Sequence, residues 1–398
     1  MPSSSQSGGA RPGPGHRPPR ILHRMEAVSM PSPTAGPLDL APFHALRLSG
    51  PRVGDPRLMR LLARPRDRDH RVVEGWIRRG LAVRDETASL HLHEYGAGRS
   101  RVRGLVGALD ISRTATPGGA AAVLPHERVQ DRQTRDLASR LVTTTLDPAP
   151  LLLVQRSPAA LRALLRQVRE QPPTHQFLDR HGQTHRLWPL ERADLVAEAS
   201  GLLAPTTAVL ADGHHRYAAH QLRLASSSET DGRALAMVID QDDLPLRIGA
   251  IHRVLGGTRL DEVVRAARTT GFTTEDADET SAPAFLEDDW LVLADGRQAV
   301  AVRHPTDQVP SRSLHDRLLP AIEGRPRILG HEHDVDQAVA RARASAGVAT
   351  LLPRPSLASI EQAVASGNGL PEKTTWFSPK PTPGAVLRQV RVAVDAPS

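Results

Sequence analysis

The sequence of 398 residues contains no cysteine, few aromatic residues and no long apolar run. Without cysteine, disulfides, Cys-ligated zinc, iron–sulfur clusters and thiol nucleophiles are all excluded. Aromatic side chains make up only 3% of the chain, and no block of basic residues is interleaved with them. Surfaces that bind nucleic acid usually combine these two residue types, so we expect no nucleic-acid partner. No apolar stretch approaches 18 residues, so we also expect no membrane-spanning helix.

Lysine is nearly absent as well. Of 51 basic residues, the only two lysines stand at 373 and 380, and the rest are arginine. The formal net charge is +7, of which +3 falls on residues 1–37 and +4 on the remainder. Acidic residues are interspersed with the basic ones throughout, which argues against a concentrated basic surface. We interpret the arginine excess as a compositional bias, which makes the two surviving lysines informative.

The chain divides by composition into a tail and three segments. Residues 1–37 are rich in Ser, Gly, Pro and Arg and lack the apolar core of a secretory signal, so we predict a disordered tail and a cytoplasmic protein. The predicted segments are an N-terminal α/β segment at 38–118, a central phosphate-binding domain at 119–256 and a C-terminal α/β segment at 257–392.

Helical and strand patterns alternate along these segments. Apolar spacing predicts helices over 131–145, 159–170, 193–203, 214–224, 260–270, 313–323, 334–344 and 356–366. Buried or alternating strands are predicted over 89–95, 102–111, 150–155, 185–190, 207–211, 235–239, 246–252, 290–294 and 299–303. Such mixing indicates an α/β to α+β fold with mixed sheets.

The sharpest motif is Asp212-Gly-His-His-Arg-Tyr217, which joins an apolar strand to a helix. Gly213 permits a tight turn with close approach of a ligand to the backbone. The first helical turn then carries His214, His215 and Arg216. Basic side chains are unusual at the positive end of a helix dipole, and a bound phosphate would relieve the conflict. Asp212 would suit Mg²⁺ or accept a proton; the alternative is a solvated helix start capped by the aspartate.

Three further segments carry candidate groups. In Pro125-His126-Glu127-Arg128, Glu127 is either a general base or an ordinary first-turn acid. His185-Arg186-Leu187-Trp188 lies on a predicted strand, and its alternative is a core tryptophan with exposed His and Arg. The Pro-punctuated loop 369–384 holds both lysines, and Lys373 beside the Thr374 hydroxyl has the residue types of a phosphate loop without its glycine spacing. Its alternative is a loop with two incidental lysines.

Metal chemistry is the weaker prediction. His214 and His215 are adjacent on a helix and point about 100° apart, so they rarely ligate one ion. His331-Glu-His-Asp334 alternates ligand types, but we expect a surface turn there.

These segments, in this order, resemble the "domain of unknown function 1015" family of bacterial and archaeal proteins. The likeness runs from Pro42-Phe-His-Ala-Leu-Arg47 to about Val390. Its markers are the three motifs above, His252-Arg253, and Pro371-Glu-Lys-Thr-Thr-Trp-Phe-Ser-Pro-Lys380. One departure is that the early Pro-Pro-Tyr-Asp-Val segment of the family is shortened here to around Val53-Gly-Asp-Pro56. The family carries no settled activity.

More distantly, the motif starting at Asp212 looks like the phosphate-binding motif of the ParB/sulfiredoxin-like fold. Within that fold, free-serine kinases pair a Pro-His-Glu segment with a later Asp-Gly-His-x-Arg segment. This resemblance implies that Glu127 acts on the substrate hydroxyl, and that the Asp212 motif holds the transferred phosphate and Mg²⁺. The two segments are 85 positions apart here, wider than in the compact kinases, so the intervening hairpin would be an insertion.

Our leading hypothesis is a nucleotide-dependent phosphotransferase acting on a small hydroxylated metabolite such as an amino acid. Its partners would be that metabolite, a nucleoside di- or triphosphate and Mg²⁺ at Asp212. Glu127 and Asp212 would be catalytic, with Gly213, His214, His215, Arg216 and Lys373 binding phosphate. Supporting residues would be His126, Arg128, His185, Arg186, Trp188, Tyr217, Arg253, Thr374 and Lys380. The alternatives are a ParB-like nucleotide-binding switch with little or no turnover, and a metal-dependent hydrolase using His126, His214 and His215.

Overall fold

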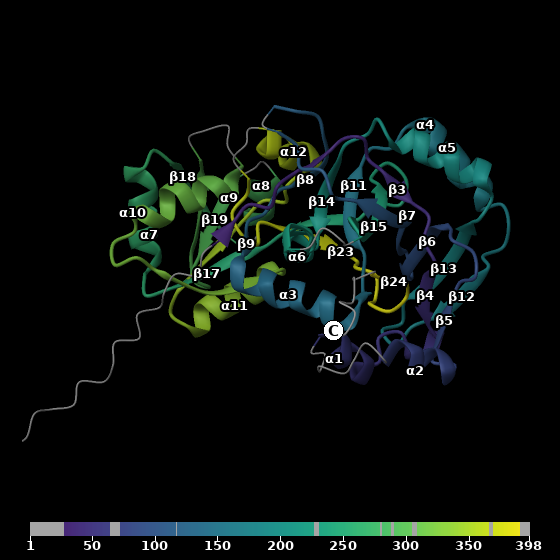
Figure 1. The fold of residues 1–398 in the computed structure, drawn as a ribbon. Helices are drawn as coiled ribbons and strands as arrows, with labels where there is room; N and C mark the ends of the chain where they lie inside the picture. The colour runs from purple at the N-terminus through teal and green to yellow at the C-terminus, as the bar shows by residue number, and fades with distance from the viewer. Residues whose placement is uncertain are drawn as a thin grey trace, which may run out of the picture.

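The computed structural model describes residues 28–63, 72–116, 118–226, 231–278, 281–287, 290–304, 309–365 and 369–390. Two lobes, each built on its own β-sheet, lie side by side with α3 (Asp131–Thr144) and α6 (His214–Ser226) between them (Figure 1). The first lobe contains a ten-stranded mixed sheet and the second a six-stranded sheet. The predicted mixed α/β class is confirmed.

The strands of the large sheet follow the order β12-β13-β6-β7-β15-β11-β14-β8-β2, with β3 pairing with β7 as well. Their bounds are β12 (His175–Leu178), β13 (Thr184–Leu190), β6 (Leu90–Ala97), β7 (Ser100–Asp110), β15 (Arg233–Asp240), β11 (Leu151–Gln155), β14 (Ala208–Asp212), β8 (Ala121–Pro125), β2 (Thr34–Ala35) and β3 (Leu40–Ala41). Two pairings are parallel, β11 with β15 and β14 with β8, and the others are antiparallel. Strands from the predicted N-terminal and central segments therefore share one sheet, which crosses the boundary expected at residue 118.

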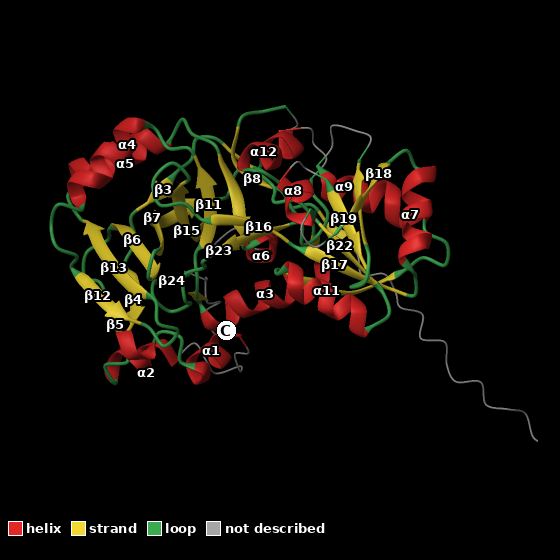
Figure 2. Cartoon of the chain, turned by 180° about the vertical axis from the view of Figure 1, so that it is seen from behind, coloured by secondary structure: helices red, strands yellow, loops and turns green. Residues whose placement is uncertain are grey.

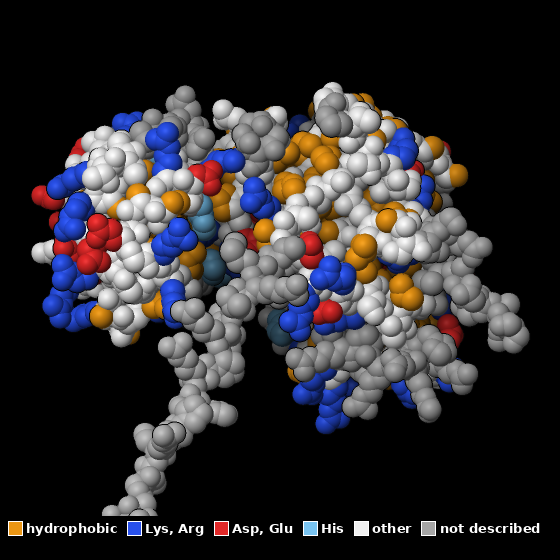
Figure 3. All heavy atoms as spheres, turned by 60° about the vertical axis from the view of Figure 1, so that its left-hand side comes forward, with side chains coloured by type: hydrophobic (Ala, Val, Ile, Leu, Met, Phe, Trp, Pro, Cys, Tyr) orange, Lys and Arg blue, Asp and Glu red, His pale blue; other side chains and the backbone are white. Residues whose placement is uncertain are grey.

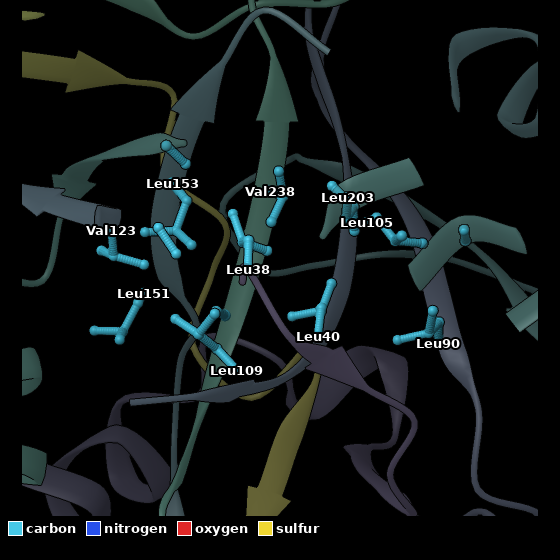
Figure 4. Packing of buried hydrophobic residues seen from close by; sticks show 14 of the residues in the cluster. Leu38, Leu40, Leu90, Leu105, Leu109, Val123, Leu151, Leu153, Leu203 and Val238 are labelled. Carbon is cyan, nitrogen blue, oxygen red and sulfur yellow. The ribbon is translucent and has the colours of Figure 1, made fainter. Parts of the chain in front are cut away.

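Apolar cores cover both faces of this sheet. On one face, α4 (Ala159–Val168) and α5 (Ala193–Leu203) contribute Leu161, Leu164 and Leu203 to the core that also contains Leu105 and Val238 of the strands. Figure 4 shows Leu203 beside these two strand residues. The other face packs against α12 (Leu357–Ala365) and against Phe377 of β23 (Thr375–Ser378). Each fully buried Leu or Phe contributes about 1.5–3 kcal/mol. The second core depends on residues near 360 and 377, so the C-terminal part of the chain helps to hold the first lobe together.

A four-stranded sheet beside the large one has the order β10-β24-β4-β5. Its strands are β10 (Leu146–Asp147), β24 (Leu387–Gln389), β4 (Ala45–Leu48) and β5 (Ala82–Arg84), and a small core joins it to η1 (Gly50–Arg52), α1 (Pro56–Ala63) and α2 (Val72–Arg78). A two-stranded pair joins β1 (Val28–Ser29) to β9 (Val129–Gln130).

The second lobe is built on a sheet of order β18-β20-β19-β22-β17-β21, seen from behind in Figure 2. Its strands are β18 (Thr273–Ala277), β20 (Ala299–Arg303), β19 (Leu291–Ala294), β22 (Val348–Leu351), β17 (His252–Gly256) and β21 (Arg327–Glu332). One face packs against α7 (Leu260–Thr269), α9 (Pro310–Ser313), the π-helical segment η3 (Leu314–Leu318) and α10 (Leu319–Ala321). The other face packs against α8 (Ala282–Glu287) and α11 (Val335–Ala344).

The lobes meet where β16 (Arg247–Ala250) leads into β17. β16 pairs with β23, whereas β17 pairs with β21 and β22 in the second lobe. The single strand predicted over 246–252 is therefore wrong, because the chain changes sheets at Ile251. The turn expected at His331 is also wrong, because His331 belongs to edge strand β21.

The predicted disordered tail of residues 1–37 needs a correction. Residues 1–27 lie outside the described residues, but residues 28–37 are part of the fold. β2 pairs with β8, Thr34 is buried, and the Tyr217 hydroxyl donates to the Ser32 carbonyl at 2.8 Å. Composition alone could not reveal these contacts, because their partners lie far along the chain. Among the helices of the described residues, none has both the length and the apolar character that a membrane span requires.

Candidate functional site

The parallel pairing of β8 and β14 sets the site's geometry. Val123 lies opposite Ala208, and Pro125 lies opposite Leu210. Because parallel strands end at the same edge of a sheet, the residues that follow them become neighbours. Glu127 thus comes beside Asp212 although 85 positions separate them in the sequence.

Glu127 is held by the C-terminal loop. Its Oε1 accepts hydrogen bonds from the Thr375 hydroxyl at 3.1 Å and from the Thr375 amide at 3.4 Å. Leu370 donates its amide to the His126 carbonyl at 2.6 Å, which ties the loop to the same segment. Burial raises the pKa of the Glu127 carboxyl to about 7, and the Asp212 charge acts in the same direction. The Thr375 hydrogen bonds and the Arg253 charge oppose this rise. A carboxylate with such a pKa can take up a proton near neutral pH.

The two histidines at the start of α6 brace the Glu127 segment. His214 Nε2 accepts the His126 amide at 3.3 Å, and His215 Nε2 accepts the Gln130 amide at 3.0 Å. Burial lowers the pKa of both histidines. Acceptor nitrogens and lowered pKa values indicate neutral imidazoles. The expectation of three cations at this helix end is therefore wrong for the two histidines.

Arg216 is also committed to the protein. Its Nη1 donates to the carbonyls of Ala149 and Pro150, and its Nη2 donates to Asp212 Oδ2 at 3.1 Å. The predicted phosphate contact of its guanidinium thus competes with three internal bonds. The first backbone N–H groups of α6 have no partner within the helix by geometry. Gly213 precedes them at φ +99°, where an added Cβ would lie 2.9 Å from Leu151 Cδ2. The tight turn thus brings Gly213 close to Leu151, and the free N–H groups of the helix start follow it directly.

Both lysines of the chain reach this site. The Lys380 ammonium forms an ion pair with Asp212 Oδ1. The Lys373 side chain is exposed, and its charge lowers the pKa of His215, after the larger effect of burial. Thr374 is buried and donates to the Pro371 carbonyl at 2.6 Å, so its hydroxyl supports the loop. Lys380, which we predicted as a supporting residue, makes the direct contact with Asp212, whereas Lys373, predicted to bind phosphate, does not.

The second lobe supplies a buried arginine. Arg253 is fully buried, and its guanidinium donates to the carbonyls of Ile251, Lys373 (2.9 Å) and Glu372 (3.0 Å). Burial lowers its pKa to about 10, whereas the Glu127 charge acts to raise it. Arg253 thereby fixes the loop that carries Lys373.

Sequence reasoning gave no site role to Thr375, and it expected a surface turn at His331 and His333. His333 stacks on Trp376 with ring centroids 4.6 Å apart, and His331 lies opposite Arg253 on the neighbouring strand. Partial burial, together with the charges of Arg253 and Lys373, lowers the pKa of His331 to about 4. The alternation of His331 and His333 was the available signal, but the register that brings β21 to the site was not. Figure 3 shows histidine side chains along the recess between the lobes, with basic side chains beside them.

Other predicted supporting residues lie elsewhere. Trp188 belongs to the large core and donates to the Gln171 carbonyl, as the alternative predicted. His185 is buried rather than exposed, and it bonds His93 and Asp179. Arg186 contacts Glu94, while Tyr217 holds residues 32 and 34. Arg128 is exposed. His126, in contrast, is buried beneath Glu127 and bonds the Thr375 hydroxyl at 2.8 Å.

The donor set at Asp212 does not match a resident metal site. Mg²⁺ binds oxygen ligands in octahedral geometry, commonly one or two carboxylates with phosphates and water. Here both Asp212 oxygens contact cationic side chains, Lys380 and Arg216. In the described ranges, no three His, Asp or Glu side chains are arranged to hold a metal ion. We therefore assign no step to a metal at Asp212, and the metal-hydrolase reading of His126, His214 and His215 loses its ligands to internal hydrogen bonds.

Comparisons with known proteins place the chain among relatives. The model of a family described as "Protein of unknown function (DUF1015)" matches residues 38–316. A free serine kinase variant in complex with AMP is similar in structure, with 15% identity, a TM-score of 0.41, and coverage of 70% of this chain and 88% of that one. A conserved hypothetical protein from Pyrococcus furiosus has 15% identity, a TM-score of 0.38 and coverage of 67% and 90%. C-terminally truncated SbnI from Staphylococcus aureus has 14% identity, a TM-score of 0.37 and coverage of 65% and 79%. Among curated proteins, none matches the sequence.

Proposed function

Because the chain belongs to the DUF1015 family, a membership that brings no activity with it, we propose a function from the site itself: a nucleotide-dependent phosphotransferase acting on a small hydroxylated metabolite such as an amino acid. One observation carries the proposal. A carboxyl whose pKa is about 7, Glu127, lies beside a helix start whose N–H groups follow a tight glycine turn, with both lysines of the chain nearby. The ParB-like character of this lobe is part of the same proposal.

The proposed reaction transfers one proton and one phosphoryl group. The acceptor hydroxyl gives its proton to the Glu127 carboxylate as its oxygen attacks the terminal phosphorus of a nucleoside triphosphate. The new O–P bond forms while the bond to the bridging oxygen breaks, and the nucleoside diphosphate leaves. In such transfers most of the rate enhancement comes from positioning and from charges that face the phosphoryl oxygens.

The protein's groups divide these tasks. The N–H groups at the start of α6 would bind the transferring phosphate, and helix dipole and backbone act together there. Lys380 neutralises Asp212 and keeps a positive charge beside the same turn. Lys373 adds a compact charge on an exposed, adaptable side chain, which suits a phosphate that changes position during transfer. His126 and Thr375 support Glu127 from beneath.

Titration calorimetry tests nucleotide binding first. We expect the full chain to bind ATP, ADP or CTP, with Mg²⁺ in the buffer. It should then release the bound nucleotide shortened by one phosphate only when a hydroxylated amino acid or similar metabolite is added. Nucleotide binding without turnover for any acceptor in the panel would support the ParB-like switch instead. Absence of nucleotide binding would reject both.

Replacing Lys373 by arginine tests whether its ammonium contacts a phosphate or whether the residue only forms part of the loop. We expect Lys373→Arg to raise the KM for the nucleotide about ten-fold, because a planar guanidinium does not replace a compact ammonium at a phosphate. Lys373 has φ +55°, and arginine places the same strain on that backbone, so folding should be unchanged. Steady-state kinetics at varied nucleotide concentration provide the measurement. An unchanged KM for the nucleotide would show that Lys373 does not contact its phosphates.

A further inference from the structure

A buried arginine in the second lobe has no acidic partner. Arg253 is fully buried, and among the described residues no carboxylate lies within ion-pair distance of it. Its two terminal nitrogens bind backbone carbonyls, and its Nε has no hydrogen-bond partner. Buried charges are normally paired, because removing a charge from water is costly unless a partner compensates it. The Glu127 carboxyl, which the Arg253 charge reaches, is itself shifted towards its neutral form.

Other polar groups share the sheet face of Arg253. On β22, Thr350 lies directly opposite Arg253, and its buried hydroxyl has no partner. On β21, the opposite residue is His331. Cross-strand neighbours project from the same face of a sheet, so these side chains stand together.

The helix that covers this face adds two more groups. Leu314 and Leu318 pack into the core beneath the helix, and Ser311 and His315 lie on the same side at helical spacing. Buried Ser311 Oγ and His315 Nε2 have no partner either. Burial lowers the pKa of His315, and the Arg253 charge acts in the same direction. The helix is π-helical at Leu314–Leu318, a rare form that often occurs at functional sites.

Four unpartnered buried polar atoms thus gather on one face of the second lobe. They are Arg253 Nε, Thr350 Oγ1, Ser311 Oγ and His315 Nε2. Buried polar atoms almost always have a hydrogen-bond partner, so a dry core is a poor explanation for four unpartnered ones on one face. One cationic donor with two hydroxyls and an imidazole is the donor set of an oxyanion site. Two exposed residues adjoin Arg253: His331 lies opposite it on β21, and the Lys373 carbonyl accepts a hydrogen bond from its guanidinium.

We propose that this cluster is a second anion subsite, which binds a carboxylate or phosphate group of the acceptor while its hydroxyl faces Glu127. Its identification as an acceptor subsite rests on the proposed function. The subsite lies in the second lobe, apart from the α6 turn that would hold the transferred phosphate, and Arg253 links the two through the loop at 372–373. An acceptor that carries an anion would therefore bridge the lobes.

Anion-dependent thermal stability of the full chain tests the subsite without nucleotide or turnover. A ligand that binds only the folded state raises the unfolding midpoint with its concentration. We expect inorganic phosphate, acetate or both to do so in the wild type, and the more effective anion identifies the group. In the double variant Ser311→Ala/Thr350→Val, the concentration needed for half of the shift should rise at least ten-fold. Without anion the midpoint should not fall, because the substitutions remove hydroxyls that bond nothing.

Thr144→Val is the matched control. The Thr144 hydroxyl is also buried, but it donates to the Arg140 carbonyl at 2.7 Å in the first lobe. We expect this variant to lose basal stability and to keep the wild-type anion response. An equal anion response in the double variant, or no response to either anion in the wild type, would overturn the subsite. A retained response in a protein without acceptor-dependent turnover would reject the phosphotransferase and leave the subsite standing.

Discussion

Glu127→Gln is expected to lower acceptor-dependent turnover by about 10²–10⁴-fold, the range that general-base catalysis contributes. Gln keeps the size of the side chain and can still accept the Thr375 hydrogen bonds, but it cannot take the proton of the acceptor hydroxyl. Nucleotide affinity should stay within a few-fold, because the phosphates would bind at the α6 turn. Coupled-assay kinetics with calorimetry separate the two effects. Full turnover in this variant would remove Glu127 from the mechanism.

The pH dependence of the wild type provides an independent check. Only the deprotonated carboxylate accepts a proton, so kcat/KM should rise with pH and level off above the Glu127 pKa of about 7. A rate limb near pH 4.5, the ordinary value for a glutamate, would place the base elsewhere.

Stability of the same variant shows whether the protein is intact. The folded state holds the Glu127 proton more tightly than the unfolded state, because burial raises the pKa from 4.5 to about 7. Wild-type stability therefore falls as pH rises between these two values and is constant outside them. Glu127→Gln lacks this loss. It should be more stable than the wild type at pH 8 by up to about 3 kcal/mol, and equal to it below pH 4.5. Urea unfolding at the two pH values measures the difference.

Arg253→Met is expected to reduce the free energy of unfolding by at least about 3 kcal/mol. Methionine fills a similar volume but leaves the carbonyls of Ile251, Glu372 and Lys373 without their donor, and hydrogen bonds to charged groups contribute about 1.5–3 kcal/mol each. The loop that carries Lys373 should loosen, so limited proteolysis should cut near residue 373 sooner than in the wild type. Denaturant unfolding gives the free energy.

The control for this substitution is an arginine on the surface of the same lobe. Arg265 lies on α7, is exposed, and faces Asp261 at 3.6 Å. Exposed ion pairs contribute little, so Arg265→Met should change stability by less than about 0.5 kcal/mol. If both variants unfold alike, the carbonyl hydrogen bonds of Arg253 do not stabilise the loop that carries Lys373.

Sequence patterns predicted the elements that bury a regular apolar stripe. α5 runs from Ala193 to Leu203 and β20 from Ala299 to Arg303, with the bounds expected from periodicity. The edge strand β21 was not predicted because its side chains are mostly exposed, so its sequence shows no alternation of buried and exposed residues. β24 escaped for another reason: it has three residues, and its partners β4 and β10 are distant in sequence. Long-range pairing rather than local preference creates such strands.

For the site, the sequence predicted which residues lie together more accurately than it predicted the role of each residue. The pairing of Glu127 with Asp212 followed from the resemblance to free-serine kinases. β8, the strand that precedes Glu127 and pairs with β14, was not among the predicted strands. The neutral state of His214 could not be predicted from the sequence, because it depends on burial beneath segments whose position is set by tertiary packing. The same holds for Arg216, whose carbonyl partners at Ala149 and Pro150 have no sequence signature.

The return of the C-terminal residues to the first lobe constrains the order of events during synthesis. Glu127 and Asp212 leave the ribosome long before Lys373, Thr375 and Lys380, which hold or neutralise them. Phe377 and Leu387 complete cores begun more than 300 residues earlier, at Phe43 and Leu46. A nascent chain halted near residue 365 would therefore carry the acidic groups of the site without its lysines, and Asp212 would gain its Lys380 partner only in the last moments of translation.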